Sequence, residues 1–508
     1  MRHRILLAAS LLYLCAANIV WIAIDTRPPF WDMANHATWS LGVLRDFQQN
    51  GIGAFLTLPY DSSIYPPLYY VVTAAFYALL GPTIDAAQLA NLPAVILLAL
   101  ATYGIARRLI EPGAATLAAV TVSFIPFLVW LSRETMLEYW LTAMVAMALW
   151  TLIESKDFSN SRWSIAFGIC SGLGMLTKWT FVIFIALPAF WAARKNPRNA
   201  IMGLSIAAVI AAYWYVPQFS ILPAFWRQNA AAAVVEQDPR AIPGTVIFYI
   251  RSFEGSVLFL PLFVLCIAGV FFVFRNGRPS FQKWAPLTFC ILGCAFGLLM
   301  LPSTDPRYAV GVLPALSVFA AAPFEKRKTA QWVMAGFLVF QHVLVSFGIP
   351  QLPERVVLAK GPGGPIPFDW NLYSQTYFGL WGPPERQDWH IETVLRRVSA
   401  GAATPVRIGL VPDLPRLDIQ AYRFAIALHD YPARIDRQVS PEEHSLLEND
   451  YLLISPGRQT AFGSQAPHAE EINAYVISHP DRFQLVDEFV LPSADTLRLY
   501  RQRKSRSD

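Results

Sequence analysis

Long, nearly uninterrupted apolar stretches recur along the first two thirds of the chain, separated by short polar breaks. About 20 apolar residues in a helix cross the hydrocarbon core of a bilayer. The pattern therefore predicts eleven membrane-spanning helices. Their expected positions are Ile5–Ile24, Ala87–Ala106, Ala114–Leu131, Leu137–Ile153, Trp163–Leu176, Phe181–Ala193, Ala200–Val216, Val257–Phe274, Trp284–Leu301, Ala309–Ala322 and Gln331–Ile349. The first stretch is too long for a signal peptide and no small-residue cleavage site follows it, so we expect it to stay in the protein.

Basic residues orient these spans, because cytoplasmic loops carry an excess of Lys and Arg. With the N-terminus in the cytoplasm, every even-numbered span ends beside two or more basic residues, such as Arg107-Arg108. The opposite short loops carry one each: Arg133, Lys178 and Arg307. The pattern predicts a multi-pass protein of the cell inner membrane, with a cytoplasmic N-terminus and an extracytoplasmic, periplasmic tail.

Two predicted outer loops are long, residues 25–85 and residues 218–251, and the tail after the last span is less apolar than the rest of the chain. Loop 25–85 contains two expected amphipathic helices, Met33–Asn50 and Pro66–Leu80, of a kind that suits a membrane surface. The Gly/Pro-rich segment Gly361–Pro367 is expected to be a linker, after which short apolar runs alternate with helix-like stretches. We therefore expect an α-helical polytopic membrane domain over residues 1–349 and a small soluble α/β domain over residues 350–508.

The composition agrees with this class of protein. Of 508 residues, 55% are hydrophobic and 15% are charged, against about 25% charged in soluble proteins. The net charge of +5 comes from dispersed residues, which argues against nucleic-acid binding. The five cysteines lie in apolar runs without a metal-binding spacing.

Charged groups gather at the outer ends of the predicted spans. Ionisable groups near the hydrocarbon are costly and often mark function, although each alone could simply tip a helix into water. Their shared side predicts that they line one cavity. Asp32 fits two roles that are compatible, a helix N-cap and a general base. The groups are Asp32, Arg133-Glu134 with Glu138, Lys178, and Asp305-Pro306-Arg307-Tyr308.

The order of these motifs carries a family resemblance. An acidic residue, Asp32, follows the first span, and the aromatic segment Tyr65–Tyr70 lies late in the same loop. Ser132-Arg133-Glu134 with Glu138 opens the fourth span, Leu176-Thr177-Lys178 joins two spans, and Arg307-Tyr308 opens another. Over about Met1–Ile349 the chain resembles the GT-C superfamily of membrane glycosyltransferases, in the branch of protein O-mannosyltransferases and bacterial lipid A aminoarabinose transferases. The tail resembles no family that we can name.

The resemblance implies an inverting glycosyltransferase. Such enzymes pass a sugar from a polyprenyl-phosphate carrier, not a nucleotide, to an acceptor hydroxyl outside the cytoplasmic membrane. Asp32 is then the general base. The second acidic residue of the family pattern corresponds to Glu138. Glu134 is close enough to compete for this role, and it is otherwise a solvated turn residue. If this region is helical, Glu134 and Glu138 lie on the same face of the helix. The residues expected to bind the donor phosphate and lipid are Lys178, Arg133, Arg307, Tyr308, Tyr65 and Tyr69.

This chain also departs from the family pattern. The protein-mannosylating branch has Asp-Glu where this chain has Asp32-Met33, and metal-binding relatives have Asp-x-Asp where it has Asp32-Met33-Ala34. We therefore expect no metal and no other cofactor. The main alternative is a transporter or flippase of lipid-linked sugars, but the chain lacks internal repeats and midplane charges. A polymerase or ligase of lipid-linked sugars would lack the early Asp. The sugar and the acceptor (lipid A, another glycan, a secreted protein or a cell-wall polymer) stay open.

Overall fold

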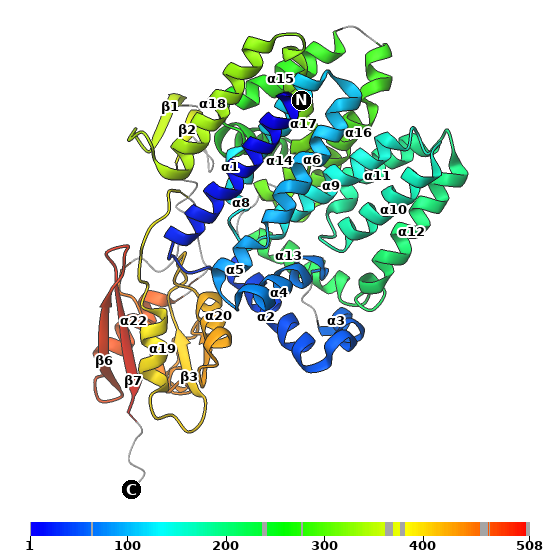
Figure 1. Ribbon diagram of the computed structural model, residues 1–508. Helices are drawn as coiled ribbons and strands as arrows, with labels where there is room; N and C mark the ends of the chain where they lie inside the picture. The colour runs from blue at the N-terminus through cyan, green and yellow to red at the C-terminus, as the bar shows by residue number, and fades with distance from the viewer. Residues whose placement is uncertain are drawn as a thin grey trace. The chain divides into compact units, whose positions relative to one another are not determined.

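The computed structural model describes residues 2–61, 65–235, 241–275, 278–360, 369–375, 382–457, 466 and 468–503 (Figure 1). The expected linker Gly361–Pro367 lies outside these residues. The first helices are α1 (Arg2–Ile24), α2 (Trp31–Asn50), α3 (Ala54–Asp61), α4 (Leu68–Leu80), α5 (Ile84–Leu89), α6 (Leu92–Leu109), α7 (Pro112–Ser123), α8 (Pro126–Leu131), α9 (Leu137–Glu154), α10 (Ser161–Met175), α11 (Phe181–Ala193) and α12 (Pro197–Tyr215). They are followed by α13 (Leu222–Val235), α14 (Ile242–Ser252), α15 (Phe259–Phe274), α16 (Arg278–Met300), α17 (Leu313–Ala321) and α18 (Lys328–Phe347). The remaining elements are β1 (Arg355–Lys360), β2 (Asp369–Ser374), α19 (Ile391–Ser399), β3 (Val406–Leu410), α20 (Ile419–His429), β4 (Ala433–Arg437), α21 (Glu443–Leu446), β5 (Tyr451–Ile454), α22 (Ala469–Ser478), β6 (Phe483–Val490) and β7 (Thr496–Gln502).

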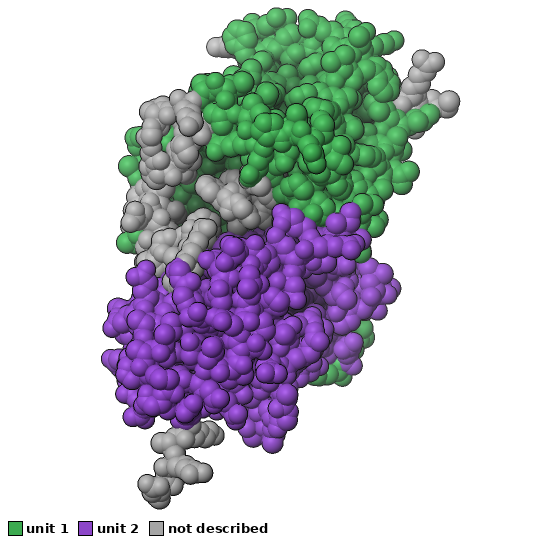
Figure 2. Space-filling view, turned by 90° about the vertical axis from the view of Figure 1, so that its left-hand side faces the viewer, with its two compact units in different colours: residues 1–22, 49–72, 88–384 green, residues 23–48, 73–87, 385–508 purple. Residues whose placement is uncertain are grey.

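The chain packs into two compact units, which Figure 2 colours separately. The first unit contains residues 1–22, 49–72 and 88–384. The second contains residues 23–48, 73–87 and 385–508, so part of the first outer loop packs with the C-terminal segment. The domain boundary expected at residue 349 stays a prediction.

Apolar helices and the two-stranded antiparallel sheet of β1 and β2 belong to the first unit. Each predicted span coincides with a helix or with a pair of helices. The span expected over Ala114–Leu131 is divided into α7 and α8, because the chain turns at Phe124 and restarts with Pro126 at the first position of α8. Helices α10 and α12 approach closely (Figure 1), since a Cβ on Gly203 would lie 2.7 Å from the Ser164 carbonyl oxygen. Small residues permit such backbone contacts in membrane helices.

The described residues contain six helical segments that are long and apolar enough to cross a membrane. They are Ile5–Ile24, Ile84–Leu109, Leu137–Glu154, Phe281–Met300, Pro306–Phe324 and Lys328–Phe347. A seventh is counted if α14 and α15, with the short π-helix between them, form one span bent by 120°. The multi-pass helical architecture is therefore confirmed, while the number eleven stays a prediction. Two of the other expected spans, α10 and α11, have 15 and 13 residues, which is short for a bilayer core.

The second unit contains a five-stranded sheet with strand order β4-β3-β5-β7-β6. Strand β3 is parallel to β4 and β5, and β7 is antiparallel to β5 and β6. Alternate residues of β5 face opposite sides, so Leu453 packs with α19 and α20 while Leu452 and Ile454 pack with α22. The α/β domain predicted in the tail is thereby confirmed, with helices on both faces of its sheet.

Helix α2 from the first outer loop completes the second unit. Its residues Ala34 and Ala37 pack against Phe424 of α20. Near its C-terminal end, Arg45 Nη2 donates a hydrogen bond to Asp430 Oδ1 at 2.8 Å, beyond the end of α20. The amphipathic helix expected over Met33–Asn50 therefore exists, and α20 covers part of its apolar face.

Candidate active site

A buried ion pair joins two of the predicted site residues. Lys178 Nζ lies 2.6 Å from Glu138 Oε1, and their side chains are 6% and 2% exposed. Glu138 lies in the first turn of α9, and Lys178 lies in the turn between α10 and α11. Because each ion costs several kcal/mol to remove from water, a buried pair is weak evidence for stability and points to function.

Two tyrosine rings flank the Lys178 ammonium group. Its Nζ lies 5.7 Å from the centroid of the Tyr65 ring and 5.3 Å from that of the Tyr308 ring, so each ring face attracts the cation. The segment after Tyr65 is fixed to the same turn by a backbone hydrogen bond from Leu68 to the Leu176 carbonyl, at 2.9 Å. The structure thus brings together residues from four segments that the sequence placed separately.

Arg307 lies beside Tyr308 in a 3₁₀-helix, Pro306–Val312. Its Nη2 lies 2.8 Å from Asp305 Oδ2, and its backbone N–H donates to the other oxygen of the same carboxylate at 2.8 Å. Its Nη1 approaches the sulfur of Met136, just before α9, at 3.9 Å. The Arg307 side chain is 21% exposed, so this cation is more accessible than Lys178.

An aromatic cluster that the sequence did not identify adjoins these groups. Trp179 lies next to Lys178 in the chain, and its ring packs against Phe225 and Trp226 of α13. Phe225 in turn contacts Tyr65, with ring centroids 5.8 Å apart. The only signal in the sequence was an aromatic residue directly after the lysine. The cluster supplies an apolar surface beside the buried cation.

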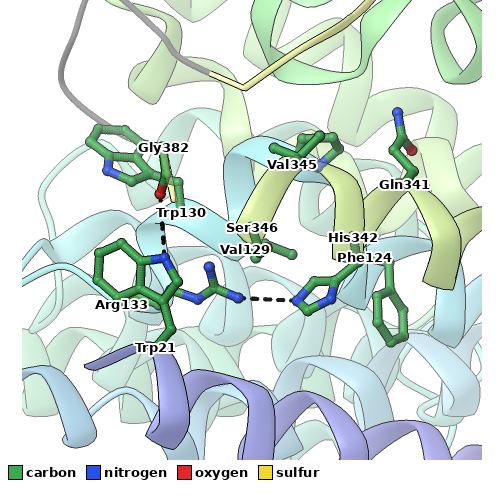
Figure 3. Close-up of a pocket in the computed structure, with 11 residues that line it drawn as sticks. Trp21, Phe124, Val129, Trp130, Arg133, Gln341, His342, Val345, Ser346 and Gly382 are labelled. Carbon is green, nitrogen blue, oxygen red and sulfur yellow. Dashed lines mark hydrogen bonds between the residues drawn. The ribbon is translucent and has the colours of Figure 1, made fainter. Parts of the chain in front are cut away.

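Arg133 is also buried, but its partners are different. Its Nε donates to Asn18 Oδ1 at 2.8 Å, and its Nη2 donates to His342 Nε2 at 3.0 Å (Figure 3). The opposite ring nitrogen of His342 lies 3.0 Å from the Tyr13 hydroxyl. The guanidinium also lies 5.2 Å from the centroid of the Trp21 ring. Burial lowers the pKa of Arg133 to about 9, which leaves it charged at neutral pH.

A small cavity adjoins this arginine network. Its volume is about 10 Å³, close to the minimum that holds one water molecule. Arg133, His342 and Trp21 line it, and Trp21 Nε1 donates across to the Gly382 carbonyl at 3.3 Å (Figure 3). None of its lining residues belongs to the Lys178 cluster. The sequence signal for this site was the presence of Asn18 and His342 within apolar spans.

The two acidic candidates near Arg133 occupy different environments. Glu134 is 3% exposed, so the expectation of a solvated turn residue was wrong; its Oε1 accepts a hydrogen bond from Trp130 Nε1 at 3.1 Å. Residues 132–136 are not helical, and Met136 is extended, so Glu134 and Glu138 do not share a helix face.

Tyr69, another of the predicted donor-binding residues, is fully buried, with its ring 5.9 Å from that of Tyr70.

Asp32 belongs to the second compact unit. It is the second residue of α2 and is half-buried. The Phe30 carbonyl accepts the first backbone hydrogen bonds of the helix, from Met33 and Ala34, so Asp32 lies in the first turn and not at the N-cap. A carboxylate in the first turn is stabilised by the helix dipole.

Metal ligands were sought throughout the described residues. No three His, Cys, Asp or Glu side chains lie close enough to bind a metal ion together in that part of the chain. The expectation of a metal-free enzyme stays a prediction.

One segment of the chain and its fold are similar to known proteins. Residues 65–220 match the family model of dolichyl-phosphate-mannose-protein mannosyltransferases. No curated protein matches the chain in sequence. Among solved structures, ArnT from Cupriavidus metallidurans bound to undecaprenyl phosphate is similar, with a TM-score of 0.58, 13% identity and 97% of each chain covered. The archaeal oligosaccharyltransferase AglB from Archaeoglobus fulgidus, in complex with an inhibitory peptide and a dolichol-phosphate, has a TM-score of 0.54 at 11% identity and covers 100% of this chain and 75% of its own.

The protein is a multi-pass membrane protein with the fold of the GT-C glycosyltransferases, as its motifs predicted. Residues 65–220 are similar to dolichyl-phosphate-mannose-protein mannosyltransferases, and the chain as a whole shares the fold of ArnT. The matched segment includes six of the predicted site residues: Tyr65, Tyr69, Arg133, Glu134, Glu138 and Lys178.

Proposed function

We propose that the protein transfers a sugar from a polyprenyl-phosphate carrier to an acceptor hydroxyl at the outer face of the inner membrane. The observation that carries the proposal is the buried Lys178 ammonium, flanked by two tyrosine rings beside an aromatic surface. A polyprenyl phosphate joins an anionic head to a long apolar chain, which is the combination that such a site suits. The family match, and a fold shared with ArnT bound to undecaprenyl phosphate, support the same donor class.

The leaving group of this reaction is a lipid phosphate, which needs cations more than it needs an acid. As the bond from the sugar's anomeric carbon to the phosphate oxygen breaks, its electron pair stays with that oxygen. Lys178 stabilises the growing charge, and Glu138 holds the ammonium in place. An ammonium has three N–H donors, so one bond to Glu138 leaves others for phosphate oxygens. Arg307 is the second cation of this proposal, because a planar guanidinium suits phosphate oxygens.

Asp32 performs the other half of the reaction. Its carboxylate takes the proton of the acceptor hydroxyl, and the acceptor oxygen forms the new bond to the anomeric carbon from the face opposite the phosphate. The configuration of the sugar is therefore inverted. The products are the glycosylated acceptor and the polyprenyl phosphate.

The test is transfer by the purified full-length protein in lipid vesicles. We expect glycosylated acceptor from a polyprenyl-phosphate sugar and none from a nucleotide sugar. Transfer from a nucleotide sugar without any polyprenyl carrier would overturn the proposal. Movement of the lipid-linked sugar between leaflets without covalent transfer would favour the flippase alternative. Lipid analysis of a deletion strain, which should accumulate the unused polyprenyl-phosphate sugar, would identify the sugar. A surface glycan short of one residue in the same strain would identify the acceptor.

A further inference from the structure

The segment that leads into Asp32 is held by the loop that follows β3. Arg416, in that loop, donates from Nη1 to the Pro28 carbonyl at 2.8 Å. Its guanidinium also lies 4.5 Å from the centroid of the Phe30 ring. Phe30 is fully buried and Arg416 is 5% exposed. Both the backbone and a side chain of the segment are therefore fixed by one arginine.

Trp31, the residue before Asp32, is held at two points. Its indole Nε1 donates to Asp413 Oδ1 at 3.2 Å, and its backbone N–H lies 3.3 Å from each oxygen of Asp418. Asp413 is 2% exposed and Asp418 is fully buried. Asp413 is itself fixed by an ion pair of 2.6 Å with Arg437 of β4. The same loop thus determines the position of the indole and of the first N–H of α2.

The backbone conformations on both sides of this contact are unusual. Trp31 has a φ of 43° and Arg416 a φ of 71°, both in the left-handed region that bulky residues rarely adopt. Such conformations persist only where the surrounding contacts determine them. The contact is therefore a defined arrangement of two segments that are more than 380 residues apart in the chain.

The loop lies where an open α/β sheet ordinarily binds a ligand. The connection from β3 leads to β4 on one side, and the connection from β4 then leads to β5 on the other side of β3. Ligands bind at the carboxyl ends of strands at such reversals. Residues 411–418 follow the carboxyl end of β3, and here they bind Phe30 and Trp31 of the same chain.

We propose that the loop of residues 411–418 is a clamp that positions Asp32, with Asp413, Arg416 and Asp418 as positioning residues; this rests on the proposed role of Asp32 as general base. The clamp fixes the first turn of α2, in which Asp32 is the second residue. A misplacement of about 1 Å at a reacting group can lower a rate about 10²-fold. The C-terminal domain therefore takes part in catalysis through its contact with the first outer loop.

The first experiment measures transfer by full-length Trp31→Phe, Asp413→Ala and the double variant. Phe keeps an aromatic ring and removes the N–H donor. We expect each single change to lower kcat at least about tenfold, with the donor KM within about twofold, because a positioning defect acts on the transition state. The double variant should lose no more activity than the more damaging single variant, because both substitutions remove the same hydrogen bond between Trp31 and Asp413. Asp436→Ala is the matched control, because Asp436 of β4 is a partly exposed acidic residue whose side-chain partners among the described residues are Arg423 and Arg434, not Trp31 or Asp413. Additive losses, or turnover within twofold of wild type, would overturn the proposal.

The second experiment measures amide hydrogen exchange over residues 30–36 without substrate. Arg416→Ala and Asp418→Ala should exchange faster than wild type there, and Asp436→Ala should not. Unchanged exchange would overturn the clamp whatever the activity. If the wild-type protein transferred no sugar, the proposed function would fail, while exchange would still decide whether the loop holds this segment. The mild change Trp31→Phe keeps the test available if an alanine variant does not fold.

Discussion

Lys178 and Glu138 lie forty positions apart in the sequence, and their buried side chains meet at 2.6 Å. Removing one partner leaves the other charge buried and unpaired, which is more damaging than the pair's net contribution to stability. The pair therefore offers a sensitive test of the site, because each side can be changed without altering its shape much.

Neutralising the lysine should affect chemistry strongly. We expect Lys178→Gln to lower transfer from a polyprenyl-phosphate sugar by at least about 10²-fold, because the leaving phosphate loses a charge that is most valuable in the transition state. A lysine that only reaches toward the headgroups would tolerate Gln. Lys195→Gln is the control, since Lys195 is 71% exposed and paired with Asp157. Near wild-type turnover of Lys178→Gln, measured with radiolabelled donor, would contradict the assignment.

The two acidic residues near the start of α9 should differ in importance. Glu138→Gln is expected to lower kcat more than Glu134→Gln, because only Glu138 is paired with Lys178. Glu134 accepts a hydrogen bond from Trp130, which a Gln can still accept. The measurement is kcat for both variants at equal expression. An inactive Glu134→Gln beside a normal Glu138→Gln would reverse the roles.

An asparagine at position 32 should preserve the fold but not the activity, because it has the shape of Asp32 and cannot accept a proton. We expect Asp32→Asn to insert normally and to lower transfer by about 10²–10⁴-fold, the usual cost of losing such a base. Asp25→Asn is the comparison in the same loop, where Asp25 is paired with Arg27 at 2.6 Å. Equal damage from both changes would show a structural role for the loop and no special role for Asp32.

The clamp should make stability depend on pH. Burial, assisted by the neighbouring Asp413, raises the pKa of Asp418 to about 7, against about 3.9 in an unfolded chain. Between these values the folded protein binds the extra proton, so the contribution of Asp418 to stability falls as the pH rises through this window. Asn is neutral throughout. The melting temperature of Asp418→Asn should therefore rise relative to that of the wild type as the pH is raised from about 5 to about 8. An unchanged difference between the two proteins at both pH values would contradict this prediction.

The orientation can be tested without any substrate. The basic residues at the even-numbered turns predict that the tail lies outside the cytoplasm. A reporter that is active only in the periplasm should therefore be active when fused after Asp508. With the N-terminus in the cytoplasm, activity of a cytoplasmic reporter at the same position would contradict the odd number of spans.

The sequence predicted the helices well because lipid-facing helices are specified by hydropathy alone. Helix α11 begins and ends at the residues expected, Phe181 and Ala193. The interruptions within a predicted span were harder to predict, since the division between α7 and α8 depends on one local turn at Phe124. Side-chain pairing could not be predicted, because it is set by tertiary packing: Glu138 pairs with Lys178, whereas Arg133 is surrounded by Asn18 and His342.

The arginine network also fixes where its protons lie. An arginine side chain can only donate hydrogen bonds, so His342 Nε2 must be the acceptor of the bond from Arg133. The ring hydrogen then belongs to Nδ1, which donates to the Tyr13 oxygen. Both hydrogen bonds of this network are therefore donated in the same direction, from the Arg133 guanidinium to the His342 imidazole and from the imidazole to the Tyr13 phenol. A doubly protonated ring would set two donors against each other, so this position accepts only the neutral tautomer with hydrogen on Nδ1.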